Sequence, residues 1–314
     1  MNRRQFVGAS AMMQALPAQP RPIPIIDTHV HLFDPRRPGG IPWPPKDDTA
    51  LYKPALPDRY RAISAPFGIR GAIEVEASPR REDNDWVLQT IQDEPLFLGT
   101  IGSLEPAEPG FTHNLQTYLR NPLFLGIRYG NLWSRDLGAS LAKPDFVVGM
   151  KSIADAGLIL DTANPTPALL ADVVKLTDAV PTLRVILDHL PQLVAPTQPA
   201  ARRAYEATVR QLTQRPQVFI KVSSVLRRVD GKVPTDPAFY KPRLDELWEQ
   251  FGADRLVYGS DWPNSDHWAE YPQVFRIVDD YFRKRGPEAA EKYFWKNSKT
   301  AYRWKKRSNE QPGA

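Results

Sequence analysis

The 314-residue chain has no cysteine, which excludes disulfide bonds, thiolate nucleophiles and cysteine-bound metals. Any metal must therefore be held by nitrogen and oxygen ligands. Beyond the N-terminus there is no run of about 18 consecutive apolar residues, so the sequence predicts no membrane-spanning helix. The net charge is only +5, the basic residues are dispersed and no nucleic-acid-binding motif is recognised, so we expect no nucleic-acid partner. Histidine is scarce, with five residues in the chain.

The first 20 residues, MNRRQFVGASAMMQALPAQP, differ from the rest of the chain. Arg3 and Arg4 begin an RR-x-F pattern that a short apolar run follows, and Ala18 is the best candidate for a cleavage position. This order is typical of a twin-arginine export signal. We therefore predict that residues 1–20 direct the protein to a bacterial periplasm. The alternatives are a disordered tail and a cytoplasmic protein.

From residue 23 onward, short apolar runs alternate with polar segments of helical spacing. The runs are rich in Ile, Val, Leu and Phe, and they have the length of buried strands. The eight predicted strands are 24–33, 71–77, 97–104, 124–130, 157–163, 184–190, 218–224 and 255–262. In one of the segments between them, Leu170, Val173 and Val174 fall on a single helical face. The hydrophobic content of 42% is ample for a large core.

Eight strands that alternate with helices predict a single-domain (β/α)8 TIM barrel, which we place at residues 21–304. A doubly wound open sheet is the alternative. It would more often carry a glycine-rich phosphate loop after the first strand, where this chain has histidines. The segment 267–303 is predicted to supply the closing helices, and residues 305–314 are predicted to be a flexible tail.

Polar side chains occupy the ends of the predicted strands, where the active site of such a barrel lies. Charged groups in apolar strands cost several kcal/mol unless they are paired, hydrogen-bonded or bound to metal, so their convergence on one rim predicts a site. In chain order these residues are His29, His31, Glu74, Glu76, Arg128, Tyr129, Asp161, Asp188, His189, Lys221, Ser223, Asp261 and Trp262.

The spacing of the H-x-H pair can be explained by strand geometry. Residues i and i+2 of a strand point to the same face, so His29 and His31 can enter the barrel mouth together and bind one cation. His189 is predicted as a third imidazole, either a metal ligand or a group that polarises a carbonyl; a histidine satisfied beneath a loop is the alternative. Asp261 follows Gly-Ser at the last strand end and is predicted as a general base or metal ligand, with a helix N-cap as the alternative.

The remaining strand-end residues have two interpretations each. Arg128 and Lys221 either hold a substrate carbonyl, carboxylate or hydroxyl, or form structural ion pairs with acids such as Glu76 or Asp161. Asp161 is either substrate-binding or structural. Asp27 and Asp188 either orient ring nitrogens or bond to backbone. Tyr129, Trp262 and His267 are predicted to contact substrate at the rim, and His113 is predicted to lie on the surface.

The segments DTHVHLFDP, IPWP, GIRY, VILDHLP, VFIKVSS and RLVYGSDWP resemble the amidohydrolase superfamily over about residues 23–303. The nearest group is that of the sugar-lactone and pyrone-dicarboxylate lactonases. The resemblance implies hydrolysis of a cyclic ester, the lactone of a sugar acid or of a small carboxylated ring. It implies a catalytic cluster of His29, His31, His189 and Asp261. A metal-dependent decarboxylase on the same scaffold is the alternative enzyme. A non-enzymatic carbohydrate-binding barrel, with Trp43, Trp133, Trp262 and Trp268 stacking on sugars, is another.

The resemblance also bears on the metal. This chain has Arg128, Asp161 and a single His189 on strands four to six, where binuclear superfamily members carry a lysine and two histidines. We therefore expect at most one divalent metal, with Zn²⁺ as the expected ion and a metal-free site as the alternative. Its ligands would be His29 and His31, completed by His189, Asp261 or Glu76. Asp261 would act as the general base, with His189 and Arg128 as further catalytic groups and Arg128 and Lys221 positioning the ring. The oligomeric state is left open by the sequence.

Overall fold

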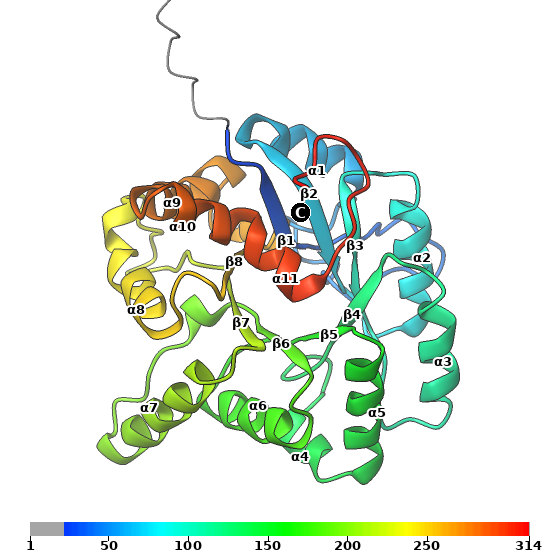
Figure 1. Ribbon diagram of the computed structural model, residues 1–314. Coiled ribbons are helices and arrows are strands. Elements are labelled where there is room, and N and C mark those ends of the chain that lie inside the picture. Colours follow the sequence, from blue (N-terminus) through cyan, green and yellow to red (C-terminus); the bar gives the residue numbers. More distant parts are fainter. Residues whose placement is uncertain (1–21, 314) are drawn as a thin grey trace, which may run out of the picture.

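The computed structural model describes residues 22–313, which form a barrel of eight parallel strands surrounded by helices (Figure 1). Each strand pairs with the next along the chain, and a parallel bridge between Val30 and Trp262 joins the last strand region to the first. The eight predicted strands and the TIM-barrel fold are confirmed. The strands are β1 Ile25–Val30, β2 Ile69–Val75, β3 Phe97–Gly102, β4 Phe124–Arg128, β5 Ile159–Asp161, β6 Arg184–Leu187, β7 Val218–Val222 and β8 Leu256–Tyr258.

The helices cover the outside of the barrel, and several carry proline in their first turn, where its missing N–H costs nothing. In α6 the predicted apolar face, including Leu170 and Val173, is buried. The helices are α1 Pro57–Ser64, α2 Arg81–Ile91, α3 Phe111–Tyr118, α4 Leu137–Leu141, α5 Pro144–Asp155, α6 Pro167–Ala179, α7 Pro199–Thr213, α8 Lys241–Phe251, α9 Tyr271–Lys284, α10 Pro287–Glu291 and α11 Asn297–Tyr302.

The barrel interior is built in layers. An apolar layer contains Ile159, Ile186, Phe219 and Val257, and it packs against Tyr302 of α11, which crosses one end of the barrel in Figure 1. Two residues further along the same strands come the buried polar groups of the opposite end. These groups are Asp161, Asp188, Lys221 and, after β8, Asp261 beyond Gly259. The two-residue period of a strand therefore places the polar layer directly above the apolar one.

The C-terminal segment is held against the barrel, although a flexible tail is predicted from residue 305. Arg307 Nη1 donates to the carbonyls of Ile91 and Glu94, at 2.9 and 3.0 Å, near the end of α2. Gln311 is 2% exposed and donates to the carbonyl of Pro95. The arginine satisfies carbonyls that the helix end leaves unpaired, which explains why the segment is ordered here.

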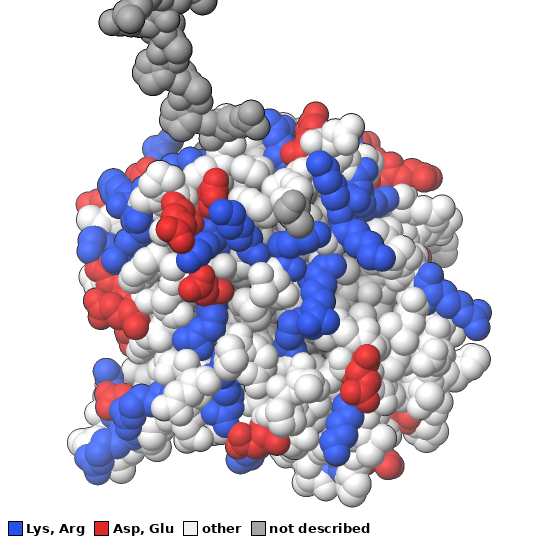
Figure 2. All heavy atoms as spheres, in the orientation of Figure 1, with Lys and Arg blue, Asp and Glu red and all other residues white. Residues whose placement is uncertain are grey.

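The predicted export signal lies outside the described residues. Within residues 22–313 no helix is long and apolar enough to span a membrane. On the face seen in Figure 2, Lys and Arg side chains are spread widely with Asp and Glu among them, in line with the dispersed charges of the sequence. His113 is exposed on α3, as predicted.

Candidate active site

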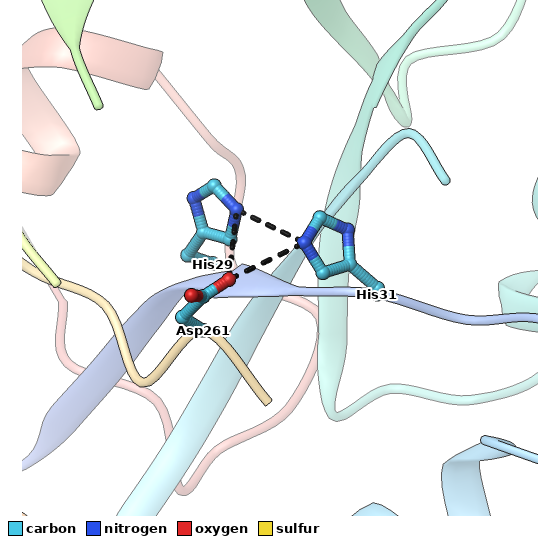
Figure 3. A group of neighbouring side chains, drawn as sticks. All are labelled: His29, His31 and Asp261. Carbon is cyan, nitrogen blue, oxygen red and sulfur yellow. Dashed lines mark hydrogen bonds and ion pairs between the residues drawn. The ribbon is translucent and has the colours of Figure 1, made fainter. Parts of the chain in front are cut away.

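Two histidines of the first strand region meet one carboxylate from the far end of the chain (Figure 3). His29 Nε2 lies 3.2 Å from His31 Nε2. Asp261 Oδ1 lies 3.6 Å from His29 Nε2 and 3.4 Å from His31 Nε2. All three side chains are buried. The structure thus brings together the groups that the sequence predicts at the ends of the first and last strands.

The imidazoles are oriented by bonds on their outer nitrogens. His31 Nδ1 lies 2.7 Å from the carbonyl oxygen of Val75, which can only accept, so Nδ1 carries a proton and Nε2 offers a lone pair to the cluster. His189 Nδ1 lies 2.7 Å from Ser223 Oγ, and its Nε2 lies 3.9 Å from Asp261 Oδ1. A third imidazole therefore faces the same carboxylate oxygen.

Asp261 is held in an uncommon backbone conformation, with φ of 60°, which turns its side chain into the mouth. Its Oδ2 accepts hydrogen bonds from Ser224 Oγ and from Asn264 Nδ2, the latter at 2.9 Å. Burial alone would raise the pKa of this carboxyl, but His189, His31 and the Ser224 hydroxyl outweigh burial and lower the pKa below its ordinary value. The group is therefore kept as a carboxylate.

The cluster has the spacing of a metal site. Nitrogen and oxygen ligands at about 2.0–2.2 Å from a tetrahedral ion lie about 3.3–3.6 Å apart, and the cluster distances are 3.2, 3.4 and 3.6 Å. Among the described residues, Asp261 Oδ1 has no hydrogen-bond donor, so this buried oxygen is available to coordinate a cation. His29, His31 and Asp261 therefore fit one divalent ion. Glu76 belongs to neither of the two close groups of potential ligands within residues 22–313.

A buried ion-pair network lies behind His29. Lys221 Nζ lies 2.6 Å from Asp161 Oδ2, 2.8 Å from Asp188 Oδ1 and 3.2 Å from His29 Nδ1. Burial raises the pKa of Asp161 to about 6, with Lys221 opposing this effect. Tyr302 also donates to Asp161, at 2.9 Å. Lys221 is fully buried in this network and does not line the cavity, so its position fits the ion-pair interpretation.

Asp27 acts on the backbone rather than on an imidazole. Its Oδ1 accepts from the backbone N–H of His29 at 3.1 Å and from that of Ser260 at 2.8 Å. Its Oδ2 accepts from the Tyr60 hydroxyl at 2.7 Å. The carboxylate thereby fixes the first strand beside the segment that carries Asp261.

Arg128 reaches the cavity next to His189. Its Nη2 lies 3.3 Å from His189 Nε2, and its Nε lies 3.3 Å from both the carbonyl oxygen of Thr162 and Asp188 Oδ2. Burial lowers the pKa of His189 to about 4, and the positive charge of Arg128 adds to this against Asp261 and Asp188. The imidazole is therefore neutral near pH 7, beside a fixed guanidinium.

A cavity of about 210 Å³ opens above the cluster, large enough for one small ring. Two indoles, three side-chain amides, Glu76 and Arg128 form its walls. Its lining residues are His31, Trp43, Glu76, Ala77, Arg128, Leu132, Trp133, Asn164, His189, Gln192, Ser224, Asp261 and Asn264. The amide residues were not predicted; Asn164 and Asn264 each follow a strand-end acid by three residues, and that position in the loop is the signal that could have found them.

Three predicted substrate contacts lie away from this cavity. The Tyr129 hydroxyl bonds to Ser140 Oγ at 2.8 Å. Trp262 is 1% exposed and packs against Tyr60. His267 Nε2 bonds to Asp48 Oδ2 at 2.8 Å. Of the predicted substrate-binding residues, Arg128 is the one that lines the cavity.

Comparison with known proteins gives a consistent result. A family model described as amidohydrolase matches residues 26–304. The chain is 25% identical over 295 residues to an L-fucono-1,5-lactonase of Burkholderia ambifaria, covering 91% of this chain and 98% of that one. A zinc-bound amidohydrolase structure from Burkholderia multivorans shares the fold, with a TM-score of 0.79, 22% identity, and coverage of 90% of this chain and 100% of that one.

A further solved structure shares the barrel at lower similarity. It is that of a probable 2-pyrone-4,6-dicarboxylic acid hydrolase from Acinetobacter baumannii, with a TM-score of 0.69 and 18% identity. It covers 89% of this chain and 99% of that one. The family match spans the barrel and all of the cluster residues. This chain belongs to the amidohydrolase family.

Proposed function

We propose that this protein is a lactonase, which hydrolyses the cyclic ester of a small ring by attack of water. The observation that carries the proposal is the carboxylate of Asp261, whose Oδ1 has no donor among the described residues and faces His29, His31 and His189 at the base of the cavity. The relative named as a lactonase, which aligns over nearly the whole chain, supports it.

His29, His31 and Asp261 are the residues that would hold a divalent ion, and Zn²⁺ is the ion we propose. The imidazole and carboxylate donor set suits zinc, and a structure of the same fold contains it. When bound, such an ion supplies Lewis-acid polarisation of the ester carbonyl and makes water more acidic.

Asp261 is the proposed general base. A carboxylate at the cavity floor can accept a proton from the attacking water and then return it to the alkoxide that leaves when the ring opens. Its second oxygen stays bonded to Ser224 and Asn264, so the carboxylate keeps one orientation throughout.

Arg128 is the proposed stabiliser of the negative charge that develops on the carbonyl oxygen, and His189 accepts a hydrogen bond from Arg128. Both line the cavity, and their nitrogens lie 3.3 Å apart. Arg128 is fixed by Thr162 and Asp188, so its donors are oriented before substrate binds. Such preorganised donors lower the barrier without reorganisation during the reaction.

The proposal is tested with purified protein and a panel of five- and six-membered lactones, with acid release followed by a pH indicator and with metal content measured in the same samples. We expect acid release, a loss of activity after chelation and recovery with Zn²⁺. Release of CO₂ from carboxylated aromatic acids, without acid release from any lactone, would replace the proposal with the decarboxylase alternative.

We further propose that residues 1–20 export the protein to the periplasm. The paired arginines, the RR-x-F pattern and the apolar run after them support this.

A further inference from the structure

Glu76 is the first residue after β2, and its carboxylate is fixed at the wall of the cavity. Its two oxygens accept from Trp133 Nε1 at 3.0 and 2.9 Å, and Oε2 also accepts from the backbone N–H of Ser78 at 3.2 Å. The side chain lines the cavity although the residue is only 5% exposed. Carboxylates fixed by N–H donors in this way are oriented acceptors. Glu76 thus has free acceptor capacity toward whatever occupies the cavity.

The loop that supplies Trp133 is strained. Asn131, Trp133 and Ser134 have φ of 37°, 58° and 60°, in the left-handed region that bulky side chains rarely adopt. Asn131 and Asn164 exchange amide-to-carbonyl hydrogen bonds at 3.0 and 2.8 Å, which tie this loop to the one after β5. Such strain persists only where the surroundings enforce it, and it is concentrated at functional sites. The indole is therefore held in place against Glu76.

The charges in the cavity walls indicate that Glu76 influences which ring substituents the cavity accepts. Arg128, the one arginine or lysine among the lining residues the structure describes, is already bound to Thr162 and Asp188 and lies beside His189. The remaining walls offer the uncharged amides of Gln192 and the two asparagines and the indole faces of two tryptophans. Apart from Arg128, which is assigned to the ester carbonyl oxygen, the described walls thus offer no Lys or Arg to bind a carboxylate on the ring.

We propose that Glu76, oriented by Trp133, is a specificity-determining residue that selects uncharged, polyhydroxylated lactones over lactones that carry a carboxylate. It accepts a hydrogen bond from a ring hydroxyl, and its negative charge disfavours an anionic substituent at the same place. A like charge placed against a wrong ligand is a common means of discrimination. This inference rests on the proposed lactonase function.

The test uses a matched pair of substrates, a six-carbon aldonolactone and the aldarolactone that differs from it by one carboxylate. Rates are measured at pH 8, above the pKa of about 7 that burial gives Glu76, and spontaneous hydrolysis is subtracted. We expect the wild type to prefer the aldonolactone in kcat/KM by at least ~10-fold, and the Glu76→Gln variant to lower that ratio by at least ~10-fold. Trp133→Phe, which keeps the aromatic ring but removes the N–H, should lower it in the same direction. Glu206→Gln, on the outer helix α7, should leave the ratio unchanged.

Binding of the two corresponding lactams, which lack the scissile ester, is measured by calorimetry on the same four proteins after loading with Zn²⁺. The same change in preference supports the inference even if turnover is slow. A ratio unchanged in a folded Glu76→Gln or Trp133→Phe variant, in turnover or in lactam binding, would overturn it. Absence of lactone turnover in the wild type would instead refute the proposed function, and lactam binding would still decide the role of Glu76.

Discussion

Lys221 Nζ lies 3.2 Å from His29 Nδ1, on the side of the imidazole that faces away from Asp261. The same ammonium pairs with Asp161 and Asp188, and all of these side chains are fully buried. The outer nitrogen of a candidate metal ligand therefore lies beside a cation that neutralises two carboxylates. Asp161 and Asp188 depend on this ammonium, because buried carboxylates without a cation are costly.

Replacing Lys221 with methionine should destabilise the protein strongly. The variant keeps the apolar stem but leaves Asp161 and Asp188 without their shared ammonium, and breaking a buried ion pair costs about 3–5 kcal/mol. Chemical denaturation should show a loss of this size in the free energy of unfolding. Lys175→Met on α6, where the lysine is exposed, should change it by less than ~1 kcal/mol. A similar effect for both variants would show that the buried network is not stabilising.

The stability of the protein should depend on pH through Glu74. Burial raises the pKa of this carboxyl to about 8, with the hydrogen bond from Thr100 opposing the effect, while in the unfolded chain the group ionises near its ordinary value. The folded state therefore favours the protonated form. The stability that Glu74 contributes is complete below the unfolded pKa and is lost as pH rises through about 8.

The Glu74→Gln variant isolates this effect, because glutamine stays neutral at every pH. We expect its melting temperature to gain on that of the wild type between pH 5 and pH 9, as measured by calorimetry. Glu82→Gln, at an exposed position of α2, is the control and should follow the wild type across the range. A Glu74→Gln curve parallel to the wild-type curve would contradict the raised pKa.

The barrel itself was predictable from the sequence, and the reason is visible in the strands. Runs such as 157–163 and 255–262 were recognised as strands because buried parallel strands are continuously apolar. Both predicted runs are longer than the strands, since β5 spans only Ile159–Asp161 and β8 only Leu256–Tyr258. Asp261 leaves extended conformation altogether, with φ of 60°, and apolar composition does not report such a turn.

The site was partly predictable for a related reason. His29, His31 and Asp261 meet because the carboxyl ends of the strands share one rim. Tyr129 and Trp262 were placed at the cavity as neighbours of true rim residues, but adjacent residues point to opposite faces, and both are packed elsewhere.

The remaining differences between the predicted and the observed site arise from the depth of a side chain in the barrel and from irregular loops. Lys221 faces inward but lies one layer below the cavity, where it meets the buried acids. Trp133 and Asn164 lie in irregular loops that have no periodicity to read, and their backbone φ is positive. Trp133 is positioned by its hydrogen bond to Glu76, and Asn164 by its hydrogen bond to the carbonyl oxygen of Asn131, and both bonds link residues far apart in the sequence.

Zinc binding should depend on the first-strand pair. We expect about one equivalent of Zn²⁺ per chain, and the His31→Asn variant should bind it at least ~100-fold more weakly, beyond the usual cost of losing an outer partner. Competition with a chromophoric chelator measures both values. His113→Asn, which changes an exposed histidine on α3, should bind zinc like the wild type. Equal affinity in the two variants would remove His31 from the ligand set.

Export should depend on the two N-terminal arginines. A reporter protein fused behind residues 1–20 should reach the periplasm of a bacterial host, because the paired arginines and the apolar run match a twin-arginine signal. The Arg3→Lys, Arg4→Lys double variant preserves the charge and should keep the reporter in the cytoplasm. Cytoplasmic retention of both fusions would leave the segment without an export role.

The most direct test of the account is kcat of the Asp261→Asn variant on a lactone that the wild type hydrolyses. Asparagine keeps the shape of the side chain but cannot accept the proton of the attacking water, so we expect kcat to fall by at least ~10². Asp58→Asn, at an exposed position of α1, should keep wild-type turnover. Near-normal turnover by a folded Asp261→Asn protein would contradict the hydrolytic centre proposed for this barrel.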